Sequence, residues 1–527
     1  MNTATSSAMH TVRIQIDGTP MDVPRGSTIA AALGTGGARR SVSGQPRAPL
    51  CGMGVCHECR VQVDGVQQLA CMTPCGEGQV IDTRPARLQA LPTAATEADG
   101  QHCDLLVVGA GPAGLQAALA AAPSGMRITL LDANPAPGGQ VWRGGPRHAT
   151  PDPARRLLDA LAHFPNVTLV TGTQIVGLAG ERALLTETPT QSGVQRFDRA
   201  ILCTGARELL LPFPGWTLPG VTGAGGLQAL IKQGLQVRGE RIVIAGTGPL
   251  LLAAAATARR AGATVLHVAE QASWASVARF STALWRWPAK AWQAATLLDP
   301  GFRPGSTVTA AHGRERVQAV TLRSGGYERR VDCERLACGF GLVPHTPLAQ
   351  LLGCALDAHG AIAVDATQQT SVAGIYAAGE CTGIGGNERA QLQGRIAGRC
   401  ATGAAVTPPL ARALARWNRF AALARERFAL GEAVTRLADA DTLICRCEDV
   451  ALQELAGCET WVQAKLHTRC GMGSCQGRIC GQAAHTLWGW TPTAPRQLSD
   501  PARIATLAQG QHDHPPHHTR TAAPLSP

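Results

Sequence analysis

The chain has 527 residues, too many for a single hydrophobic core, and this length favours about three or four domains. Apolar residues make up 45% of it, as in ordinary globular proteins, and no apolar run reaches the roughly 18 residues that span a bilayer. The net charge of +11 is spread along the chain without a basic stripe or interleaved aromatic residues, which excludes nucleic acid as an expected partner.

Residues 1–10 are polar and lack the basic and apolar segments of a signal peptide, so a cytoplasmic location is expected. Weak attraction to an acidic partner or to anionic lipid at the inner face of the membrane is left open. The 18 cysteines are then expected to be metal ligands rather than disulfides. They cluster at 51–71 and 445–480, whereas isolated cysteines among apolar residues indicate buried thiols.

Residues 1–92 are predicted to form a ferredoxin-like domain rich in strands. Val12, Ile14 and Ile16 alternate with polar residues, and the following Asp-Gly pair is typical of a hairpin turn. Ser27 or Thr28 is placed to cap a short helix over residues 29–33. The polar segment 93–102 is predicted to be a linker.

The first cysteine cluster carries an iron–sulfur pattern. Its spacing, C-x4-C-x2-C followed by a distant cysteine, is that of plant-type [2Fe–2S] ferredoxins, and the predicted ligands are Cys51, Cys56, Cys59 and Cys71. Gly52 and Gly54 free the backbone to wrap around the cluster and to point N–H groups at its sulfurs.

Two alternatives stay open in this region, a zinc site and a Rieske-type histidine ligand, and one further cysteine has to be interpreted. A four-cysteine zinc site usually has two C-x2-C pairs, whereas only one is present. Cys75 is interpreted as a bystander. His57 is expected to face solvent, although spacing alone does not exclude a Rieske-type ligand.

From residue 103 to about 407, strand-like runs alternate with Ala-rich helices, which predicts a doubly wound α/β region with two Rossmann-like units. The predicted divisions are a first FAD-binding part at 103–225, an NAD-binding-like unit at 226–335 and a second FAD-binding part at 336–407.

The first unit has a complete dinucleotide fingerprint. Gly109 makes the turn, Gly111 lets a pyrophosphate approach the helix N-terminus, and Gly114 lets helix and strand pack closely. Asp132 ends the next strand, where it can accept the ribose hydroxyls.

Three further segments favour FAD over NAD in this unit. They are a Gly-Gly turn able to lie against the flavin, a Thr-Gly-Ala segment after an apolar strand, and a Gly-acid pair at the end of another strand. Their predicted cofactor-binding residues are Gly139, Gln140, Thr204, Gly205, Gly379 and Glu380.

The second unit has Gly246 and Gly248, but Leu251 stands where the third glycine is expected. Glu270 after the next strand favours NAD over NADP if a nucleotide binds. A structural unit without nicotinamide chemistry is equally compatible with this pattern.

Thioredoxin-reductase chemistry is disfavoured, because residues 103–400 contain no C-x2-C pair. Their closest cysteines, Cys333 and Cys338, have a C-x4-C spacing but lie in a strand-like stretch without the flanks of a redox pair.

The C-terminal part begins with a helical connector at 408–437. The segment 438–490 is predicted to be a small helical [2Fe–2S] domain, and residues 491–527 a largely disordered tail. The C-x-C pair of this domain and its distant, glycine-flanked cysteine pair resemble those of bacterioferritin-associated ferredoxins, and this resemblance implies that the ligands are Cys445, Cys447, Cys475 and Cys480. Cys470 could substitute for one of them, and zinc is an alternative metal. The run His512–His518 could bind a divalent metal, but a solvated tail is favoured.

Four strings identify a family resemblance over nearly the whole chain: Cys51-Gly-Met-Gly-Val-Cys56, Gly138-Gly-Gln140, Ala378-Gly-Glu380-Cys-Thr-Gly-Ile-Gly-Gly386, and Cys445-Arg-Cys-Glu with Gly471-Met-Gly-Ser-Cys-Gln-Gly-Arg478. The chain resembles the first two subunits of hydrogen cyanide synthase fused into one. It also resembles the α subunits of opine oxidase, D-hydroxyproline dehydrogenase and heteromeric sarcosine oxidase. This resemblance implies a pyridine nucleotide-disulfide oxidoreductase-type core and a C-terminal domain of the bacterioferritin-associated ferredoxin type.

The resemblance further implies a role in electron transfer, as the FAD- and [2Fe–2S]-containing subunit of a complex. In such a complex a separate FAD-dependent β subunit of the amino acid oxidase type would oxidise a C–N bond, and electrons would pass to a respiratory acceptor. Two other functions stay open: a self-contained NAD(P)H:acceptor oxidoreductase, and a module that binds or delivers iron–sulfur clusters. No general base is found near the flavin motifs, and the substrate, the final acceptor and the use of NAD are not specified by the sequence.

Overall fold

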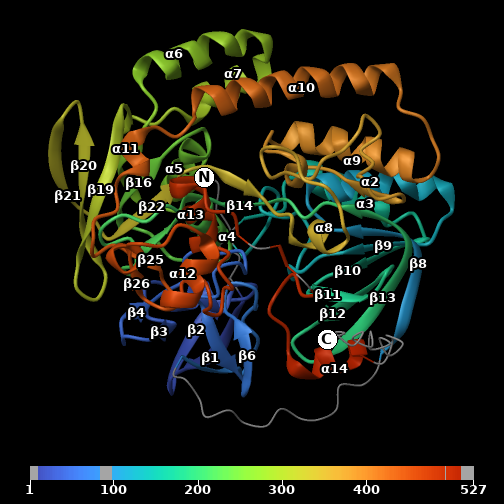
Figure 1. Ribbon diagram of the computed structural model, residues 1–527, viewed down its shortest axis with the longest axis horizontal. Helices are drawn as coiled ribbons and strands as arrows, with labels where there is room; N and C mark the ends of the chain where they lie inside the picture. Colours follow the sequence, from blue (N-terminus) through green and yellow to red (C-terminus); the bar gives the residue numbers. More distant parts are fainter. Residues whose placement is uncertain (1–9, 84–97, 147, 493, 496, 512–527) are drawn as a thin grey trace, which may run out of the picture.

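The computed structural model describes residues 10–83, 98–146, 148–492, 494–495 and 497–511. In Figure 1 the first FAD-binding unit lies on the right, the second Rossmann unit lies centre-left, and both cysteine-rich modules lie below and beside the second unit. Among the described residues, no helix is long and apolar enough to cross a membrane.

The N-terminal module is a mixed sheet with strand order β2-β1-β7-β5-β6. Its elements are β1 (Thr11–Ile16), β2 (Thr19–Pro24), α1 (Ile29–Leu33), β3 (Arg39–Arg40), β4 (Pro46–Arg47), β5 (Arg60–Val63), β6 (Val66–Leu69) and β7 (Val80–Asp82). Val12 and Ile14 are buried and their neighbours exposed, as the alternation predicted. The Thr28 hydroxyl caps α1 by accepting a hydrogen bond from the backbone N–H of Ala31.

The first Rossmann unit has the sheet order β10-β9-β8-β13-β12-β11, with β24 paired to β13. Its strands are β8 (Ala98–Val108), β9 (Ile128–Leu131), β10 (Val167–Val170), β11 (Gln174–Gly180), β12 (Ala183–Glu187), β13 (Ser192–Leu202) and β24 (Ile375–Ala377). Its helices are α2 (Pro112–Ala121), η1 (Ala122–Ser124), α3 (Asp152–Leu161), α8 (Pro347–Leu351), η3 (Glu380–Thr382) and α9 (Asn387–Ala401). Strand β8 already begins within the predicted linker, because residues 98–102 pair with β13; residues 93–97 lie outside the described residues.

The second Rossmann unit is a parallel sheet in the order β15-β22-β16-β17-β18, followed by the antiparallel sheet β19-β20-β21. Its strands are β15 (Val221–Gly223), β16 (Arg241–Gly246), β17 (Thr264–Glu270), β18 (Phe302–Pro304), β19 (Ser306–Gly313), β20 (Val317–Ser324), β21 (Tyr327–Asp332) and β22 (Arg335–Gly339). Its helices are α4 (Ala224–Lys232), α5 (Leu250–Arg260), α6 (Trp274–Ala283), η2 (Leu284–Arg286) and α7 (Pro288–Leu297). The pair β14 (Ala206–Glu208) and β23 (Leu342–Pro344) connects the two units.

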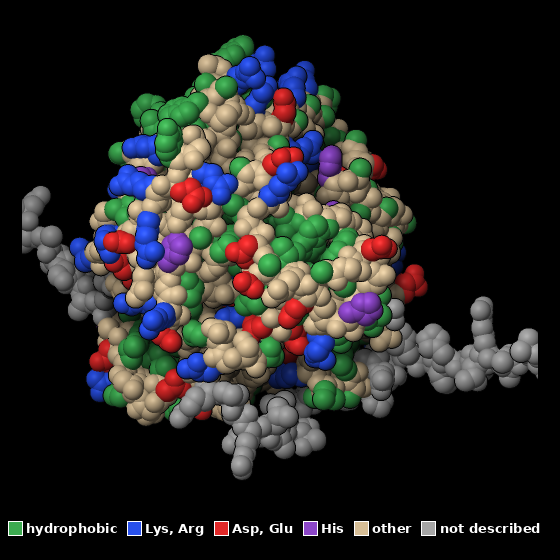
Figure 2. All heavy atoms as spheres, turned by 60° about the vertical axis from the view of Figure 1, so that its left-hand side comes forward, with side chains coloured by type: hydrophobic (Ala, Val, Ile, Leu, Met, Phe, Trp, Pro, Cys, Tyr) green, Lys and Arg blue, Asp and Glu red, His purple; other side chains and the backbone are tan. Residues whose placement is uncertain are grey.

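The C-terminal part crosses the molecule before it reaches the second cysteine cluster (Figure 1). Its elements are α10 (Pro408–Arg427), α11 (Glu432–Thr435), β25 (Leu443–Cys445), β26 (Val450–Ala451), η4 (Leu452–Leu455), α12 (Trp461–Thr468), α13 (Cys480–Trp488) and α14 (Ile504–Gln511). Figure 2 shows Lys and Arg side chains gathered at the top of one face, the end at which α6, α7 and α10 lie, and acidic side chains nearer its middle.

The prediction of a disordered tail is wrong for its first part. Leu498 bridges Gly177 of β11, Ser499 N–H donates to Val176 O at 2.9 Å, and Thr506 of α14 donates to Glu187 at 2.8 Å. This segment is ordered because it pairs with β11, a strand at the edge of its sheet. The sequence of the tail contains no pattern that predicts this pairing. The run His512–His518 lies outside the described residues.

Candidate iron–sulfur and flavin sites

The four N-terminal cysteines are all buried and linked by contacts among their sulfurs and backbones. Gly54 N–H lies 3.3 Å from Cys71 Sγ, and Cys71 N–H lies 3.4 Å from Cys59 Sγ. Hydrogen bonds from the Cys56 and Cys71 side chains hold the pKa of the Cys51 thiol well below its usual range. This is the donor set that a [2Fe–2S] cluster requires, with backbone N–H groups already directed at sulfur.

The loop that carries Cys51, Cys56 and Cys59 owes its shape to left-handed backbone at three positions. Gly52 and Gly54 have φ of 63° and 78°, as expected from their glycines, and His57 has φ of 55°. A side chain at Gly54 would press on Met72, whose nearest atom lies 3.2 Å from the ideal Cβ position.

His57 does not face solvent, so that prediction is wrong. The side chain is buried, and burial lowers its pKa to about 4, with Arg478 and Arg60 adding to the effect. Arg478 belongs to the C-terminal module, which covers this loop. Because that module lies far along the chain, the residues next to His57 could not predict its burial. Cys75 is also buried, and burial raises its pKa to about 12, as fits an inert thiol.

The C-terminal module brings together all five of its candidate cysteines. Cys445, Cys470 and Cys480 have sulfurs within 4.8 Å of one another, and Cys447 and Cys475 have theirs 3.6 Å apart. The predicted ligands therefore fall into two groups: Cys445 and Cys480 lie with Cys470, which was interpreted as a spare thiol, and Cys447 lies with Cys475. Three thiols at this spacing would suit zinc as well as an iron–sulfur cluster, so metal analysis must separate the two.

The fingerprint of the first Rossmann unit has the expected geometry. Gly109 has φ of 101°, and a Cβ there would lie 2.4 Å from Cys203 O. A Cβ at Gly114 would lie 1.8 Å from Gly109 O, so only glycine lets α2 pack against β8. A Cβ at Gly111, in contrast, would meet protein only at Gly139 Cα, at 3.8 Å. The chain leaves Gly111 the room that a pyrophosphate needs at the N-terminus of α2.

The acid of this unit is part of the glycine turn. Asp132 Oδ2 accepts the N–H of Ala110 at 2.6 Å, and its Oδ1 accepts both the backbone N–H and the side-chain amide of Asn134 at 2.7 Å. The carboxylate is thus fixed beside the phosphate-binding turn, where the predicted ribose contact would be made.

The other predicted FAD contacts lie around the same strand ends. Gly139 has φ of 58° and faces Gly111, with the partly exposed Gln140 beside it. The Thr204 hydroxyl donates to His345 O at 2.6 Å, and Gly205 follows it with φ of 73°.

Gly379 and Glu380 follow β24, as expected for the second Gly-acid segment. Gly379 has φ of 88° and its N–H donates to Gln393 at 3.1 Å. The Glu380 carboxylate accepts the N–H of Gly386 at 2.9 Å, and burial raises its pKa. Glu380 therefore shapes the loop before α9, and its carboxylate is directed at protein N–H groups.

The second Rossmann unit differs from the first in what packs against its glycine turn. Gly246, Gly248 and Glu270 form the expected turn, with Glu270 accepting the Gly248 N–H at 2.7 Å, and Leu251 is fully buried at the third position. Phe428 lies 4.0 Å from the position of a Cβ on Gly248.

Hydrogen bonds hold the segment 428–431, which contains Phe428, against the second glycine turn. Thr247 donates to Phe428 O at 3.2 Å, while Gln271 donates to Ala429 O at 2.8 Å and accepts from Gly431 N at 3.1 Å. The chain segment 428–431 thus lies over the turn and over the end of β17, where a nucleotide would have to bind.

Two connections join the FAD-binding unit to the N-terminal cysteine loop, and neither was found from the sequence. The buried Arg143 donates to Gly52 O at 3.1 Å and to Asn134 at 2.6 Å. Glu208, on β14, accepts the N–H groups of Gly225 and Gly226 at 2.7 and 2.9 Å, at the end of α4 that packs against Leu50 and Cys51. A basic residue shortly after the Gly-Gly turn and an acid after Thr-Gly-Ala were the only sequence signals.

Comparison with known proteins agrees with this architecture. Residues 103–398 match the pyridine nucleotide-disulphide oxidoreductase family, and residues 9–86 match the 2Fe-2S iron-sulfur cluster binding domain. A solved structure, the L-proline dehydrogenase from P. horikoshii, has the same fold with a TM-score of 0.69; it is 19% identical and the match covers 95% of this chain and 98% of that chain.

Two curated relatives are similar over most of their length, and a third over a short part. The HcnB subunit of hydrogen cyanide synthase from Pseudomonas aeruginosa is 34% identical, covering 71% of this chain and 90% of the relative. An opine oxidase subunit from Rhizobium meliloti is 33% identical, covering 73% and 92%. The sarcosine oxidase alpha subunit of the same species is 37% identical, over only 26% of this chain and 16% of the relative. The chain is therefore a flavoprotein oxidoreductase of the pyridine nucleotide-disulphide oxidoreductase family, with an FAD-type Rossmann core and an N-terminal 2Fe-2S binding domain.

Proposed function

We propose that this protein is the electron-transfer subunit of a heteromeric amino acid, opine or amine dehydrogenase. In this proposal a separate FAD-dependent subunit oxidises a C–N bond. The FAD of this chain receives the electrons, and two [2Fe–2S] clusters pass them singly to a respiratory acceptor such as a quinone. A flavin takes two electrons together and a cluster moves one, so the combination converts pairs into single electrons.

The observation that supports the proposal best is that part of the N-terminal thiol group packs in the same buried core as the C-terminal cysteines, while Cys59 and Cys71 lie in a second buried cluster. Cys51 and Cys56 and the five C-terminal cysteines belong to the same cluster of buried residues. Arg143 joins the N-terminal loop to the first Rossmann unit, and Glu208 joins β14 to the helix α4, against which that loop packs. The names of the relatives, subunits of an opine oxidase and a sarcosine oxidase, support a donor with a C–N bond.

The covering segment 428–431 argues against the alternative of a self-contained NAD(P)H oxidoreductase, since Phe428 and Ala429 lie where the nucleotide would bind. Rapid bleaching of the flavin by NADH, without a partner, would favour that alternative. Protein that holds clusters but no flavin after purification would favour cluster delivery instead.

The proposed location is the cytoplasm, with the acceptor reached at the inner face of the membrane. The test is co-purification with the product of the neighbouring gene, followed by a screen of amino acids and opines with an artificial dye acceptor. Substrate-dependent dye reduction that needs both chains is expected; reduction by the partner alone, with no electrons reaching this chain's flavin, would contradict the proposal.

The cluster assignment has its own test. Cys56→Ser should remove one [2Fe–2S] EPR signal and leave FAD bound, because Cys56 lies outside the flavin unit. Analysis of anaerobically isolated protein should find iron and acid-labile sulfide for two clusters. Zinc in the C-terminal module, or survival of both EPR signals in the variant, would overturn the ligand sets.

A further inference from the structure

The two cysteine-bearing loops contact each other through a buried ion pair. Glu58 stands between Cys56 and Cys59, and Arg446 stands between Cys445 and Cys447. Glu58 Oε1 accepts a hydrogen bond from Arg446 Nε at 3.0 Å, with side-chain exposures of 1% and 3%. The charged residue next to the thiols of one module therefore touches the charged residue next to the thiols of the other.

Both partners of this pair are held from further sides. Glu58 Oε2 lies 2.9 Å from Arg39 Nη2. Arg446 donates to Trp216 O at 2.8 Å, and its guanidinium lies 4.9 Å from the centre of the Trp216 ring. Trp216 in turn donates its indole N–H to Leu443 O at 2.7 Å. A planar guanidinium fixed in this way specifies one relative position of the two loops.

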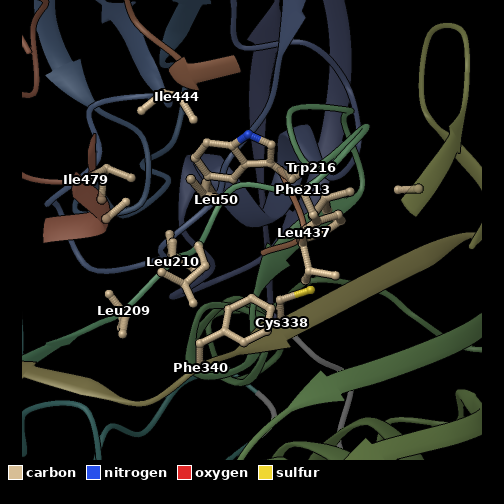
Figure 3. Packing of buried hydrophobic residues seen from close by; sticks show 14 of the residues in the cluster. Leu50, Leu209, Leu210, Phe213, Trp216, Cys338, Phe340, Leu437, Ile444 and Ile479 are labelled. Atoms are coloured by element: carbon tan, nitrogen blue, oxygen red, sulfur yellow. The ribbon is translucent and has the colours of Figure 1, made fainter. Parts of the chain in front are cut away.

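Apolar packing surrounds the same contact. Figure 3 shows Leu50, Ile444 and Ile479 gathered near Trp216. Each of these three aliphatic residues directly precedes a cysteine of one of the two thiol groups. All of them are buried, so the shortest way between the thiol groups runs through packed protein.

A second contact keeps the modules from sliding past each other. The buried Arg47 of the N-terminal module donates to Arg446 O at 3.4 Å and forms an ion pair with Asp449. Asp449 also accepts the Ser43 hydroxyl at 2.5 Å. These hydrogen bonds and this ion pair keep the distance between the two thiol groups fixed.

We propose that Glu58, Arg446 and Trp216 are positioning residues for direct one-electron exchange between the N-terminal and C-terminal clusters. This inference rests on the proposed function, which supplies the reduced flavin as donor and a respiratory carrier as acceptor. In the step one electron leaves the N-terminal centre and enters the C-terminal centre, and no proton or atom moves.

The test uses the anaerobically purified full chain, first checked for iron and sulfide sufficient for two clusters. On full reduction, the EPR signals of wild type should be broadened or split by the neighbouring cluster. In Arg446→Gln this interaction should weaken, and the arrival of electrons at the C-terminal cluster after rapid reduction should slow on the order of tenfold, about 1.4 kcal/mol in barrier. The reduction potential of the C-terminal cluster should also fall, because a nearby positive charge is lost.

Two further variants make the result specific. Arg469→Gln removes the charge of an exposed arginine of the same module, which pairs with the partly buried Glu448 at 2.9 Å, and should leave the magnetic interaction and the rate of transfer as in wild type. Arg446→Lys keeps the charge but not the planar contacts, so it should restore the potential without fully restoring the rate.

The possible results distinguish failure of this inference from failure of the proposed function. Full iron and sulfide with two independent, unbroadened EPR signals, or a transfer rate that Arg446→Gln and Glu58→Gln leave unchanged, would overturn this inference and leave the proposed function standing. Iron for one cluster only, or zinc, would overturn the proposed function itself. If Arg446→Gln loses its metal, Arg446→Lys and Glu58→Gln decide the question by the same measurements.

Discussion

The two Rossmann units carry nearly the same glycine turn and differ in what lies above it. In both, an acid after the second strand accepts an N–H of the turn, Asp132 from Ala110 at 2.6 Å and Glu270 from Gly248 at 2.7 Å. Above the first turn lies the open Gly-Gly segment, and above the second lies Phe428. The motif fixes the shape of the turn, whereas the segment packed against it decides whether a nucleotide can enter.

The largest expected effect comes from closing the first turn. Gly111→Val should abolish most FAD binding, because its side chain would occupy the space of the pyrophosphate, while the chain offers it no close protein contact except Gly139. The measurement is flavin content per chain from absorbance after release. Gly248→Ala, a change at the corresponding glycine of the second unit, should keep wild-type flavin even though its φ of 92° strains any side chain there. Equal loss in both variants would erase the distinction between the units.

The next effect concerns the third position of each motif. Leu251 is fully buried where the first unit has Gly114, so Leu251→Ala should destabilise the second unit by about 2–5 kcal/mol through a cavity. A lower midpoint of chemical unfolding with unchanged flavin content is the expected result. An unchanged midpoint would mean that the second unit does not depend on this side chain for its packing.

A third experiment asks whether the covering segment excludes the nucleotide. Phe428→Ala with Gln271→Ala removes the ring over Gly248 and the two hydrogen bonds to residues 429 and 431. Because Phe428 is only half-buried, the substitution should cost about 1–3 kcal/mol of stability. NADH binding, followed by its fluorescence, should become measurable in the double variant and be absent from wild type. Tight NADH binding by wild type would show that the segment is no barrier.

Local motifs predicted much of this molecule. The Thr28 cap, the left-handed glycines of the Cys51 loop and the close approach at Gly114 each follow from a few neighbouring residues, and each is found as expected. The pyridine nucleotide-disulphide oxidoreductase-type core and the N-terminal 2Fe-2S domain were likewise confirmed.

Contacts between distant segments could not be predicted in the same way. The burial of His57, the ordering of the tail on β11 and the cover of the second turn by Phe428 depend on docking between parts of the chain that no short pattern relates. The same is true of Glu58 with Arg446, although both stand inside recognised cysteine motifs. The sequence showed a charged residue between two predicted ligands in each motif, but it did not indicate that these two residues pair with each other.

The smallest expected effect tests the connection between the two units. Glu208 on β14 is buried, and burial raises its pKa to about 7 even though Gly225 and Gly226 donate N–H groups to it. The folded state therefore binds the proton more tightly than the unfolded state, so this group's contribution to stability is greatest at low pH. That contribution is lost as pH rises through about 7.

Between pH 6 and 8, wild type should accordingly lose about 1 kcal/mol that Glu208→Gln does not lose, because the amide cannot ionise. The amide keeps only one of the two acceptor oxygens, so the variant should be less stable than wild type, by an amount that does not depend on its own ionisation. The measurement is the unfolding midpoint at each pH, compared with Glu432→Gln at an exposed glutamate, which should follow wild type. If Glu208→Gln shows the same pH dependence as wild type, the carboxylate is already ionised at neutral pH, and the joint between the units is held by a charged group rather than a neutral one.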